Sequence, residues 1–174
     1  MAEVVRIYRQ DMPAVRFVGK KYGGSEVGYS EQWEKWFDLG WFEPLERMYS
    51  AFPSGSEDDD AYVGLMRCCP GAPFEYWIGM FLSAEADVPV GYQSIDFAPF
   101  ELGVAWLRGA ESEIYAQEET AMAALAEQGI RPSADARGAF WFVERYACPR
   151  FTQTDEEGNV TLDVSLISGW KEDK

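Results

Sequence analysis

Histidine is absent from all 174 residues of the chain. This absence removes the side chain that most often serves as a general base near neutral pH and most often binds transition metals. Catalytic triads and dyads that depend on histidine are therefore excluded. Any chemistry has to run on carboxylates, tyrosine, cysteine or lysine, and the sequence predicts neither a metal site nor a bound cofactor.

Cysteine is scarce as well: the chain has 3, at Cys68, Cys69 and Cys148, without C-x-x-C spacing. An odd number of cysteines fits a reducing compartment, and we expect all of them to behave as buried small hydrophobic residues. Long apolar runs are missing too, and the segment after Met1 has no basic region followed by an apolar stretch. These absences predict a cytoplasmic protein without a membrane partner.

Basic residues are outnumbered, because 15 Lys and Arg stand against 30 Asp and Glu, which gives a net charge of −15. Such a surface repels phosphate backbones, so direct nucleic-acid binding is disfavoured. It favours cationic ligands or a basic protein partner, although a plain solvated surface is the commoner explanation. The acidic run at residues 57–60 is interpreted as a solvated loop, because it lacks the Gly and the distant Glu of a calcium-binding loop.

Aromatic residues, in contrast, are abundant, with 7 Trp, 9 Tyr and 11 Phe. An excess of rings indicates a lined cavity or an interface in addition to a core, although an aromatic-rich core alone would also account for it. A chain of 174 residues is close to the size at which one hydrophobic core is expected. We therefore treat residues 1–174 as a single domain.

An internal repeat organises the chain. Residues 12–19 and 98–105 both read as extended segments in which Pro opens a run of alternating apolar residues. A helical pattern and then two strand-like runs follow each of these segments. The sequence thus predicts an α+β fold with two strand-helix-strand-strand units, about 1–84 and 90–170.

Periodicity places the individual helices and strands. Residues 31–39 are expected to form a helix with Ser30 as its N-cap, and a second short helix is expected over 42–48. Residues 111–128 predict the longest helix, which Gly129 ends. The strand-like runs are 62–69, 74–82, 140–148 and 160–167, with turn residues at 155–159.

The strand predicted at 140–148 carries the most informative pattern, because successive side chains of a strand point to opposite faces. One face carries Phe140, Phe142, Glu144, Tyr146 and Cys148. The other face carries Trp141, Val143, Arg145 and Ala147. A carboxylate among rings is costly to bury unless it is paired, hydrogen-bonded or left for a ligand. Glu144 is therefore the main candidate for binding or acid–base chemistry, and the alternative is a wet strand edge or an ion pair with a distant Lys or Arg.

Several segments of the chain resemble the GyrI-like small-molecule-binding family, the effector-binding domain that also occurs in AraC-type and multidrug-responsive transcription regulators. The order and spacing of the segments carry the resemblance, together with the internal repeat; the segments are 74–79, 88–92, 98–109 and 140–146. The similarity covers nearly the whole chain in a stand-alone form, without the DNA-binding helices of the fused regulators. A regulatory role would therefore need a separate partner.

The resemblance implies a fold and a site. The fold is a pseudo-twofold pair of the two units, whose antiparallel sheets frame an aromatic cleft. An acidic residue lies at the base of that cleft, and in this sequence it matches Glu144, followed by Tyr146. Members of the family take up bulky aromatic, often cationic compounds, which fits a carboxylate surrounded by rings.

Three functions are consistent with these observations. The first is the sensing or sequestration of an aromatic, cationic small molecule through Glu144. The second, implied by stand-alone relatives, is the hydrolysis of electrophilic cyclopropane-type compounds, with Glu144 as the acid–base group and Tyr146 assisting it. The third is an acidic protein that acts on gyrase, as the family name implies for some members.

Other aromatic residues are ligand-binding candidates beside Glu144 and Tyr146. They are Phe142, Trp36, Tyr76, Trp77, Trp106 and Tyr22. Trp36 belongs to an aromatic stripe at helical spacing, a pattern that more often marks a core than a cavity wall. Tyr76 and Trp77 point to opposite faces of their strand, so only one of them can face the cleft. Tyr22 precedes a flexible Gly-Gly pair and is expected to lie at the lip of the cleft.

Overall fold

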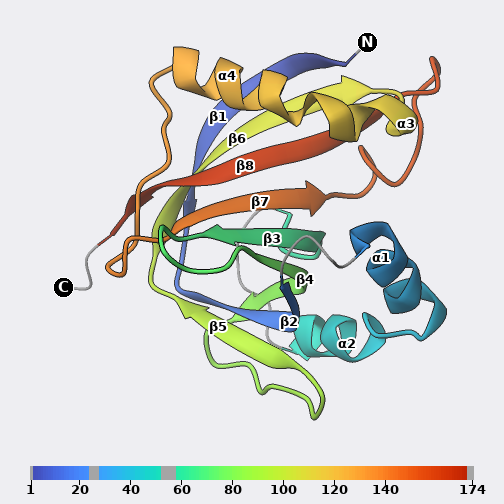
Figure 1. Cartoon of the computed structure of the whole chain (residues 1–174). Coiled ribbons are helices and arrows are strands. Elements are labelled where there is room, and N and C mark those ends of the chain that lie inside the picture. Colours follow the sequence, from blue (N-terminus) through green and yellow to red (C-terminus); the bar gives the residue numbers. More distant parts are fainter. Residues whose placement is uncertain (1, 24–27, 52–57, 172–174) are drawn as a thin grey trace.

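The computed structural model describes residues 2–23, 28–51 and 58–171. Within these ranges the strands form one antiparallel sheet of eight (Figure 1). The strands are β1 (Glu3–Met12), β2 (Val15–Gly23), β3 (Tyr62–Cys68), β4 (Glu75–Ser83), β5 (Gln93–Phe97), β6 (Phe100–Gly109), β7 (Phe140–Tyr146) and β8 (Val160–Trp170). Their order across the sheet is β1-β6-β8-β7-β3-β4-β2-β5, so β1 and β5 are its edges.

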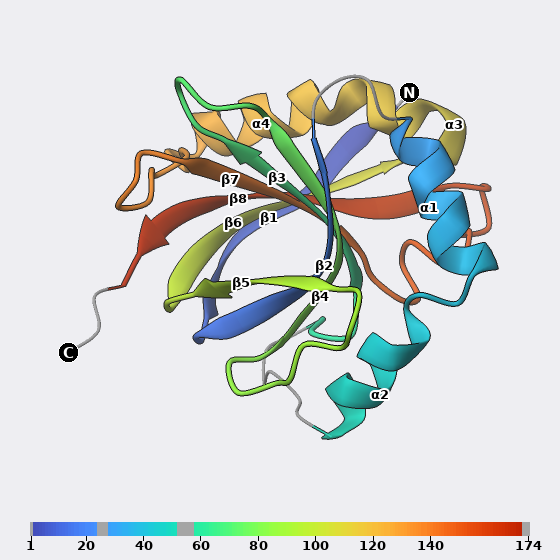
Figure 2. The same ribbon diagram turned by 60° about the horizontal axis from the view of Figure 1, so that its bottom comes forward.

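Short helices accompany the sheet in two groups. The first group is α1 (Tyr29–Asp38) and α2 (Glu43–Ala51), and the second is α3 (Glu111–Ile114), a 3₁₀ turn (Tyr115–Gln117) and α4 (Glu118–Glu127). Figures 1 and 2 show α3 and α4 along β1, β6 and β8, with α1 and α2 at a separate part of the sheet. Among the described residues, no helix combines the length and the apolar character that crossing a membrane requires.

The two predicted units share a single sheet. β3 of the first unit pairs with β7 of the second in antiparallel register, from Tyr62 opposite Tyr146 to Cys68 opposite Phe140. Each strand thereby satisfies backbone groups that would stay unpaired at the edge of a separate sheet. The α+β class is confirmed, whereas the expectation of more than one sheet is wrong.

The two faces of the sheet bury different apolar clusters. The inner face packs side chains from all parts of the sheet, including Phe17, Trp77 and Phe100. The outer face is covered in two places, by α4 through Leu125 and by α1 through Trp36. α1 is amphipathic and buries Trp36, whereas the alanine-rich α4 packs through Ala121 and Leu125, one turn apart.

Each Pro-led segment runs into one strand, as expected, but the strand begins after the Pro and not at the first residue of the segment. Residues 12–19 contain the end of β1, a break at Pro13 and the start of β2. Residues 98–105 follow β5 and enter β6 only at Phe100. Proline lacks the backbone N–H that a sheet ladder needs, so each Pro lies between two strands, of which only the later one was expected. The edge strands β1 and β5 are absent from the predicted elements for this reason.

The helix ends also differ from the prediction. Gly28, and not Ser30, occupies the N-cap position of α1, without a side-chain capping bond. The helix expected over 111–128 breaks at Gln117, which adopts φ −119° and ψ 18°. The Gln117 side chain accepts a hydrogen bond of 3.2 Å from the Ala2 amide, a long-range contact that local periodicity does not reveal. The stop after this helix is confirmed, because Gly129 has φ +76°.

The cysteines are less buried than expected. Cys68 and Cys69 are half-buried and Cys148 is exposed, so the prediction of buried small hydrophobic residues is wrong. Cys68 and Cys148 both lie at or beyond strand ends, since β3 ends at Cys68 and β7 ends at Tyr146. Strand alternation no longer fixes side-chain direction at such positions.

The acidic run is not only a solvated loop. Glu57 lies outside the described residues, but Asp58 accepts hydrogen bonds of 2.7 and 3.2 Å from Arg150. Arg150 also donates to the fully buried Asp163 at 2.8 Å, and Asp163 accepts a bond of 3.0 Å from Arg145. Asp58, Arg150, Asp163 and Arg145 thus form a buried charge row of alternating sign, in which each charge has an opposite neighbour.

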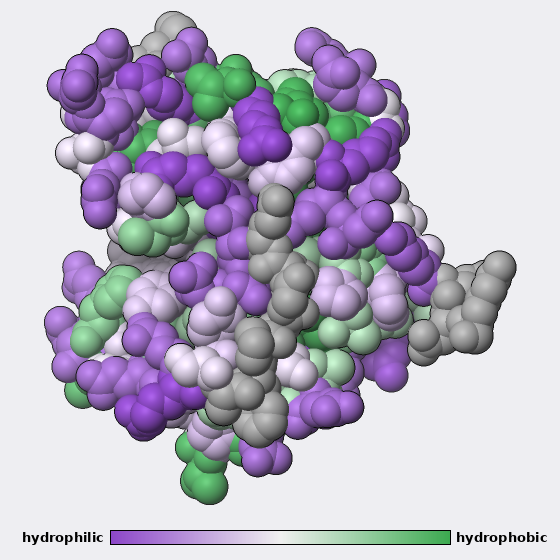
Figure 3. All heavy atoms as spheres, turned by 180° about the vertical axis from the view of Figure 1, so that it is seen from behind, coloured by the Kyte–Doolittle hydropathy of each residue, from purple (hydrophilic) through white to green (hydrophobic). Residues whose placement is uncertain are grey.

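The surface is mainly polar. Figure 3 shows the molecule from behind, where hydrophilic residues cover most of the face and hydrophobic ones occur in small separate groups. Exposed large hydrophobic side chains are scattered, as at Phe37 in α1 and at Val90 between β4 and β5. Scattered exposures of this kind are ordinary for a folded domain.

Candidate functional site

Glu144 lies in β7 on the outer face, where the two helix-covered parts of the sheet meet. Its strand neighbours Phe142 and Tyr146 pack against the apolar cluster beneath α4. Tyr76, from β4, belongs to the cluster beneath α1 and α2. The Glu144 side chain is 7% exposed, so a carboxylate is buried at the junction of two apolar clusters.

Two phenol groups hold this carboxylate. The hydroxyl groups of Tyr76 and Tyr146 donate to Glu144 Oε1, at 3.1 and 3.3 Å. The Trp33 indole Nε1 in turn donates to the Tyr76 hydroxyl at 3.0 Å. Among the residues that the structure describes, no Lys or Arg forms an ion pair with Glu144. Hydrogen bonds therefore stabilise the buried carboxylate, and within this part of the chain no basic side chain neutralises it.

Aromatic rings surround these hydrogen bonds. Tyr29 stacks on Tyr76 with ring centroids 4.2 Å apart, and Trp33 meets Tyr146 edge to face at 4.8 Å. Tyr29, Trp33 and Tyr146 are only half-buried, so part of each of these residues remains accessible. We call Glu144, Tyr76, Tyr146, Trp33 and Tyr29 the Glu144 cluster.

Gly64 makes the hydrogen bond between Tyr76 and Glu144 possible. It lies in β3, directly opposite Glu144 in β7, and β3 separates β7 from β4, which carries Tyr76. A Cβ atom at position 64 would lie 2.6 Å from the Tyr76 hydroxyl oxygen and 2.8 Å from Glu144 Oε1. Only a residue without a side chain lets the Tyr76 ring cross β3 and reach the carboxylate.

We expect Gly64→Ala to lower the free energy of unfolding by about 1–3 kcal/mol, because the added methyl group displaces the Tyr76 hydroxyl from Glu144. Urea denaturation followed by tryptophan fluorescence measures this change. Gly23→Ala is the matched control, since nothing lies within 4 Å of a Cβ atom built at Gly23. Equal stability of the two variants would show that position 64 has room for a side chain.

A second carboxyl group, from Glu118 at the start of α4, reaches the cluster. The Glu118 side chain is half-buried, and its carboxyl group is close enough to Glu144 for the two to interact. Its Oε1 atom is shielded from solvent and has no hydrogen-bond partner in the described part of the chain. Burial, the hydrogen bond to Glu144 and the charge of Glu144 raise the pKa of Glu118 to about 9. Glu118 is therefore protonated near neutral pH.

The phenols around the carboxyl pair do not titrate in the same range. Burial and the charge of Glu144 raise the pKa of Tyr76 and of Tyr146 well above the usual tyrosine value. Burial, and then the charge of Glu111, raise the pKa of Tyr115 to about 12. The phenols therefore remain donors while the carboxyl pair gains or loses its proton. The cluster can thus hold a positive charge and release a proton.

The structure brings together some of the predicted site residues and separates others. Glu144, Tyr146 and Tyr76 are in contact. Phe142 shares their face of the sheet but packs toward the cluster beneath α4. The remaining predicted residues, Trp36, Tyr22, Trp77 and Trp106, lie elsewhere.

Trp36 and Tyr22 form a separate pair beneath α1. Trp36 is fully buried, and its indole N–H donates to the Tyr22 hydroxyl at 2.9 Å. Trp77 and Trp106 pack on the inner face of the sheet, which is the face opposite to Glu144. The Gly-Gly segment after Tyr22 extends into 24–27, which lie outside the described residues.

Gly64 and Glu118 are absent from the predicted site. Glycine in the middle of an apolar strand is a signal of close approach, and this signal was present in the sequence at Gly64. Glu118 carries no comparable signal, because several acidic residues surround it in the sequence. Within 2–23, 28–51 and 58–171, no group of three or more Cys, Asp or Glu side chains is placed to hold a metal ion.

No family model matches this chain, and none of the curated proteins does. Solved structures do match. A protein from Staphylococcus aureus MU50, described as a candidate bacterial transcription regulation protein, superposes with a TM-score of 0.62 and 16% identity, over 96% of this chain and 99% of its own.

Two further structures share the arrangement. SAV2435, whose structure contains bound tetraphenylphosphonium, has a TM-score of 0.63 and 16% identity, over 96% of this chain and 94% of its own. An integron cassette protein from the mobile metagenome of Vibrio cholerae has a TM-score of 0.50 and 8% identity, over 95% of this chain and 97% of its own. At such identities the likeness concerns the fold, and function has to be argued from the site.

Proposed function

We propose that this chain binds bulky aromatic cations at the Glu144 cluster and thereby senses or sequesters them. The observation that carries the proposal is the buried carboxylate of Glu144, which two phenols hydrogen-bond and no described basic residue neutralises. A buried negative charge without a cationic neighbour is costly, and a cationic ligand removes that cost on binding.

The rings of the cluster supply the second part of the recognition. Tyr29, Trp33 and Tyr146 bring rings to the cluster, and these residues are only half-buried. Aromatic faces attract delocalised cations and also bury the apolar substituents of such ligands. The tetraphenylphosphonium bound to SAV2435 is a compound of this class, which supports the same class of ligand for this chain.

The order of strands supports a duplicated, GyrI-like architecture. Counted from its two edges, the sheet contains β1-β6-β8-β7 and β5-β2-β4-β3. Each half thus has an edge strand, then the first, third and second strands of one strand-helix-strand-strand unit. In this architecture the Glu144 cluster takes residues from both units: Glu144 comes from the second, and Tyr76 and Trp33 come from the first.

Tetraphenylphosphonium and tetraphenylborate test the proposal, because they have similar shape and opposite charge. We expect the phosphonium to shift the indole N–H signal of Trp33 in ¹⁵N-resolved NMR spectra and the borate to leave it in place. The Trp33 signal is the right reporter, since its N–H bonds to the Tyr76 hydroxyl. A Trp33→Phe variant assigns it. Equal shifts with both ions would contradict the proposal that the Glu144 cluster selects its ligand by positive charge.

Affinity for tetraphenylphosphonium is expected to increase with pH. Below its raised pKa, about 9, Glu118 carries a proton, and above that value Glu118 is charged. A bound cation favours the deprotonated pair, so affinity rises by up to about tenfold per pH unit as the pH approaches that value. The phosphonium itself does not titrate. Calorimetry in buffers of different ionisation enthalpy measures the released proton.

Glu118→Gln is the control for this pH dependence. The variant keeps the shape of the side chain but cannot ionise, so its affinity should stay level between about pH 6 and about pH 9. Tyr76, Tyr146 and Tyr115 remain protonated over this range, because their pKa values are all raised. A wild-type protein that binds the phosphonium without releasing a proton would contradict the assignment of this proton to Glu118.

Hydrolysis of electrophilic small molecules at the same carboxyl groups is the second candidate. The observation that favours it is the pairing of Glu118, whose pKa is raised, with Glu144. One neutral and one charged carboxyl group side by side can act as acid and base toward a bound water molecule. Mass spectrometry after incubation with a cyclopropane-bearing compound tests this candidate, and no hydrated product above a Glu144→Ala control would dismiss it.

A further inference from the structure

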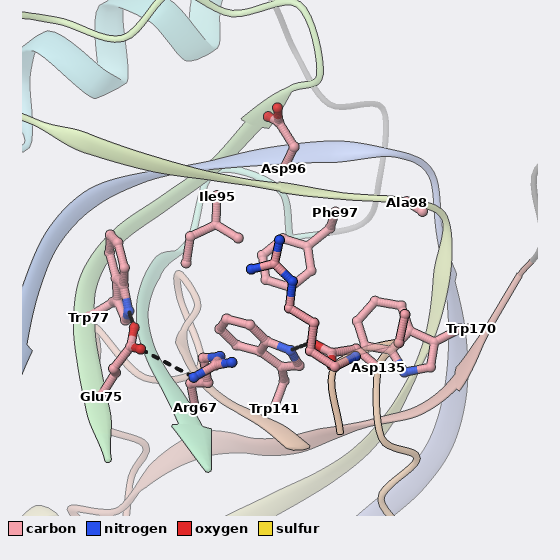
Figure 4. A pocket seen from close by; sticks show the side chains of 12 residues that line it. Arg67, Glu75, Trp77, Ile95, Asp96, Phe97, Ala98, Asp135, Trp141 and Trp170 are labelled. Atoms are coloured by element: carbon pink, nitrogen blue, oxygen red, sulfur yellow. Dashed lines mark hydrogen bonds and ion pairs between the residues drawn. The ribbon is translucent and has the colours of Figure 1, made fainter. Parts of the chain in front are cut away.

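A cavity of about 790 Å³ opens on the inner face of the sheet, away from the Glu144 cluster (Figure 4). It lies among the ends of β3, β4, β5, β7 and β8 and the segment before β7. Its size is within the range of natural small-molecule sites. β7 separates the two regions, because Trp141 lines the cavity while Glu144 points to the opposite face.

The walls of the cavity are aromatic. Trp77, Phe97, Trp141 and Trp170 line it. Trp77 and Trp141 are only 5% and 4% exposed, and Phe97 meets Trp141 edge to face at 5.0 Å. Rings packed in this way are ordered before a ligand arrives, and the half-buried Trp170 has the most accessible surface of the four.

The indole N–H groups of these walls are all used within the protein. Trp77 donates to Glu75 Oε1 at 3.0 Å, Trp141 to Asp135 Oδ2 at 2.9 Å and Trp170 to the Ser133 carbonyl at 2.9 Å. These bonds fix the orientation of the rings, and the Arg67 guanidinium lies over the Trp141 ring at 5.8 Å. None of these indole N–H groups is left to require a hydrogen-bond acceptor from a ligand.

The carboxylates at the cavity are engaged as well. Glu75 forms an ion pair of 3.3 Å with Arg67, which Figure 4 shows beside Trp141. Asp135 accepts bonds from the Trp141 indole and from the Ala139 amide. These interactions use the negative charge of Glu75 and Asp135 to hold the walls in place.

The other two charged residues of the cavity, Asp96 and Arg137, do not hold its walls in place. Asp96 forms an ion pair of 2.7 Å with Arg16, and Figure 4 shows it directed away from the centre of the cavity. Arg137 also lines the cavity, and in the part of the chain that the structure describes its guanidinium group has no hydrogen bond or ion pair. The charge left for a ligand is therefore positive.

We propose that this cavity is a second small-molecule site, which binds flat aromatic carboxylates against its aromatic wall with the carboxylate on Arg137. The two faces of the sheet then select ligands of opposite charge: a cation at the Glu144 cluster and an anion at the cavity. The inference does not rest on the function of the Glu144 cluster, because the two sites share no residue.

2-Naphthoate and its neutral amide, 2-naphthamide, test the second site by calorimetry and by the indole N–H signals of Trp77 and Trp141. We expect the carboxylate to bind at least about tenfold more tightly than the amide, the gain typical of a hydrogen bond to a charged group. Both indole signals should shift, while that of Trp33 should not. Equal affinities, or a shift confined to Trp33, would overturn the proposal.

Arg137→Gln should remove the preference for the carboxylate, because Arg137 supplies the unpaired charge. Arg131→Gln is the matched control, since Arg131 is exposed in the same segment and does not line the cavity. Ala136→Phe is a second test, in which the new ring at an exposed position fills the cavity and should abolish binding of both compounds. Unchanged naphthoate binding in Arg137→Gln, or in Ala136→Phe, would contradict the assignment of this cavity.

Discussion

Glu144→Gln is expected to weaken tetraphenylphosphonium binding by about 2–5 kcal/mol, which is about 30-fold or more, because it removes the buried charge that faces the cation. Glutamine keeps the length of the side chain and can still accept hydrogen bonds from Tyr76 and Tyr146. The loss therefore reports on charge and not on a collapsed cluster. Titration calorimetry at about pH 8, where the carboxyl pair is partly deprotonated, measures it.

Glu127→Gln is the control for this substitution. It changes the net charge of the protein by the same amount, but Glu127 is exposed at the end of α4 and lies outside the cluster. Its affinity for the phosphonium should match that of the wild type. If Glu144→Gln and Glu127→Gln bound the ion equally well, the general acidity of the surface would be the attraction, and the proposed site would be wrong.

Asp163→Ala is expected to lower the free energy of unfolding by about 3–5 kcal/mol. Asp163 is fully buried, and its removal leaves Arg145, which is 2% exposed, without its closest negative partner. Arg150 is affected less, because it keeps its ion pair with Asp58 at 2.7 Å. Urea denaturation followed by tryptophan fluorescence gives the change in free energy, and the midpoint should fall while the slope stays constant.

Asp96→Ala provides the matched surface control. Asp96 forms an ion pair with Arg16, but its side chain is 70% exposed, so the loss should be at most about 1 kcal/mol. The double variant Arg145→Met, Asp163→Leu removes both charges at once and should recover much of the lost stability. A single Asp163→Ala variant as stable as Asp96→Ala would mean that Arg145 finds another partner or reaches water.

Strand alternation was sufficient to place Glu144 and Tyr146 on one face of β7. The period of two in 140–146 separates Glu144 and Tyr146 from Trp141 and Arg145, and the structure has them on opposite faces. The same rule separates Tyr76 from Trp77. The face on which each of these side chains lies depends only on the local geometry of its own strand. A short segment of sequence is therefore enough to predict it.

Strand alternation does not predict which distant strands pair with one another or in which register. Gly64 opposite Glu144 depends on the register between β3 and β7, and nothing in either segment alone fixes it. Glu118 is the first residue of α4, directly after the break at Gln117, so its position beside Glu144 depends on where the helix breaks. The Gln117 side chain accepts a hydrogen bond from the Ala2 amide, which is distant in sequence. Trp36 was equally ambiguous, because a helical stripe of rings has the same pattern over a core as beside a cavity.

The pairing of β3 with β7 has a consequence for unfolding. Tyr76 reaches Glu144 across Gly64, so a ligand held by both residues is attached to each half of the sheet. The two halves could then separate between β3 and β7 only after the ligand is released. The binding free energy would therefore be added to the free energy needed to break this strand pairing. Backbone amides along β3 and β7 should accordingly exchange hydrogen more slowly as the ligand concentration rises, whereas the edge strands β1 and β5 continue to open locally at their own rate.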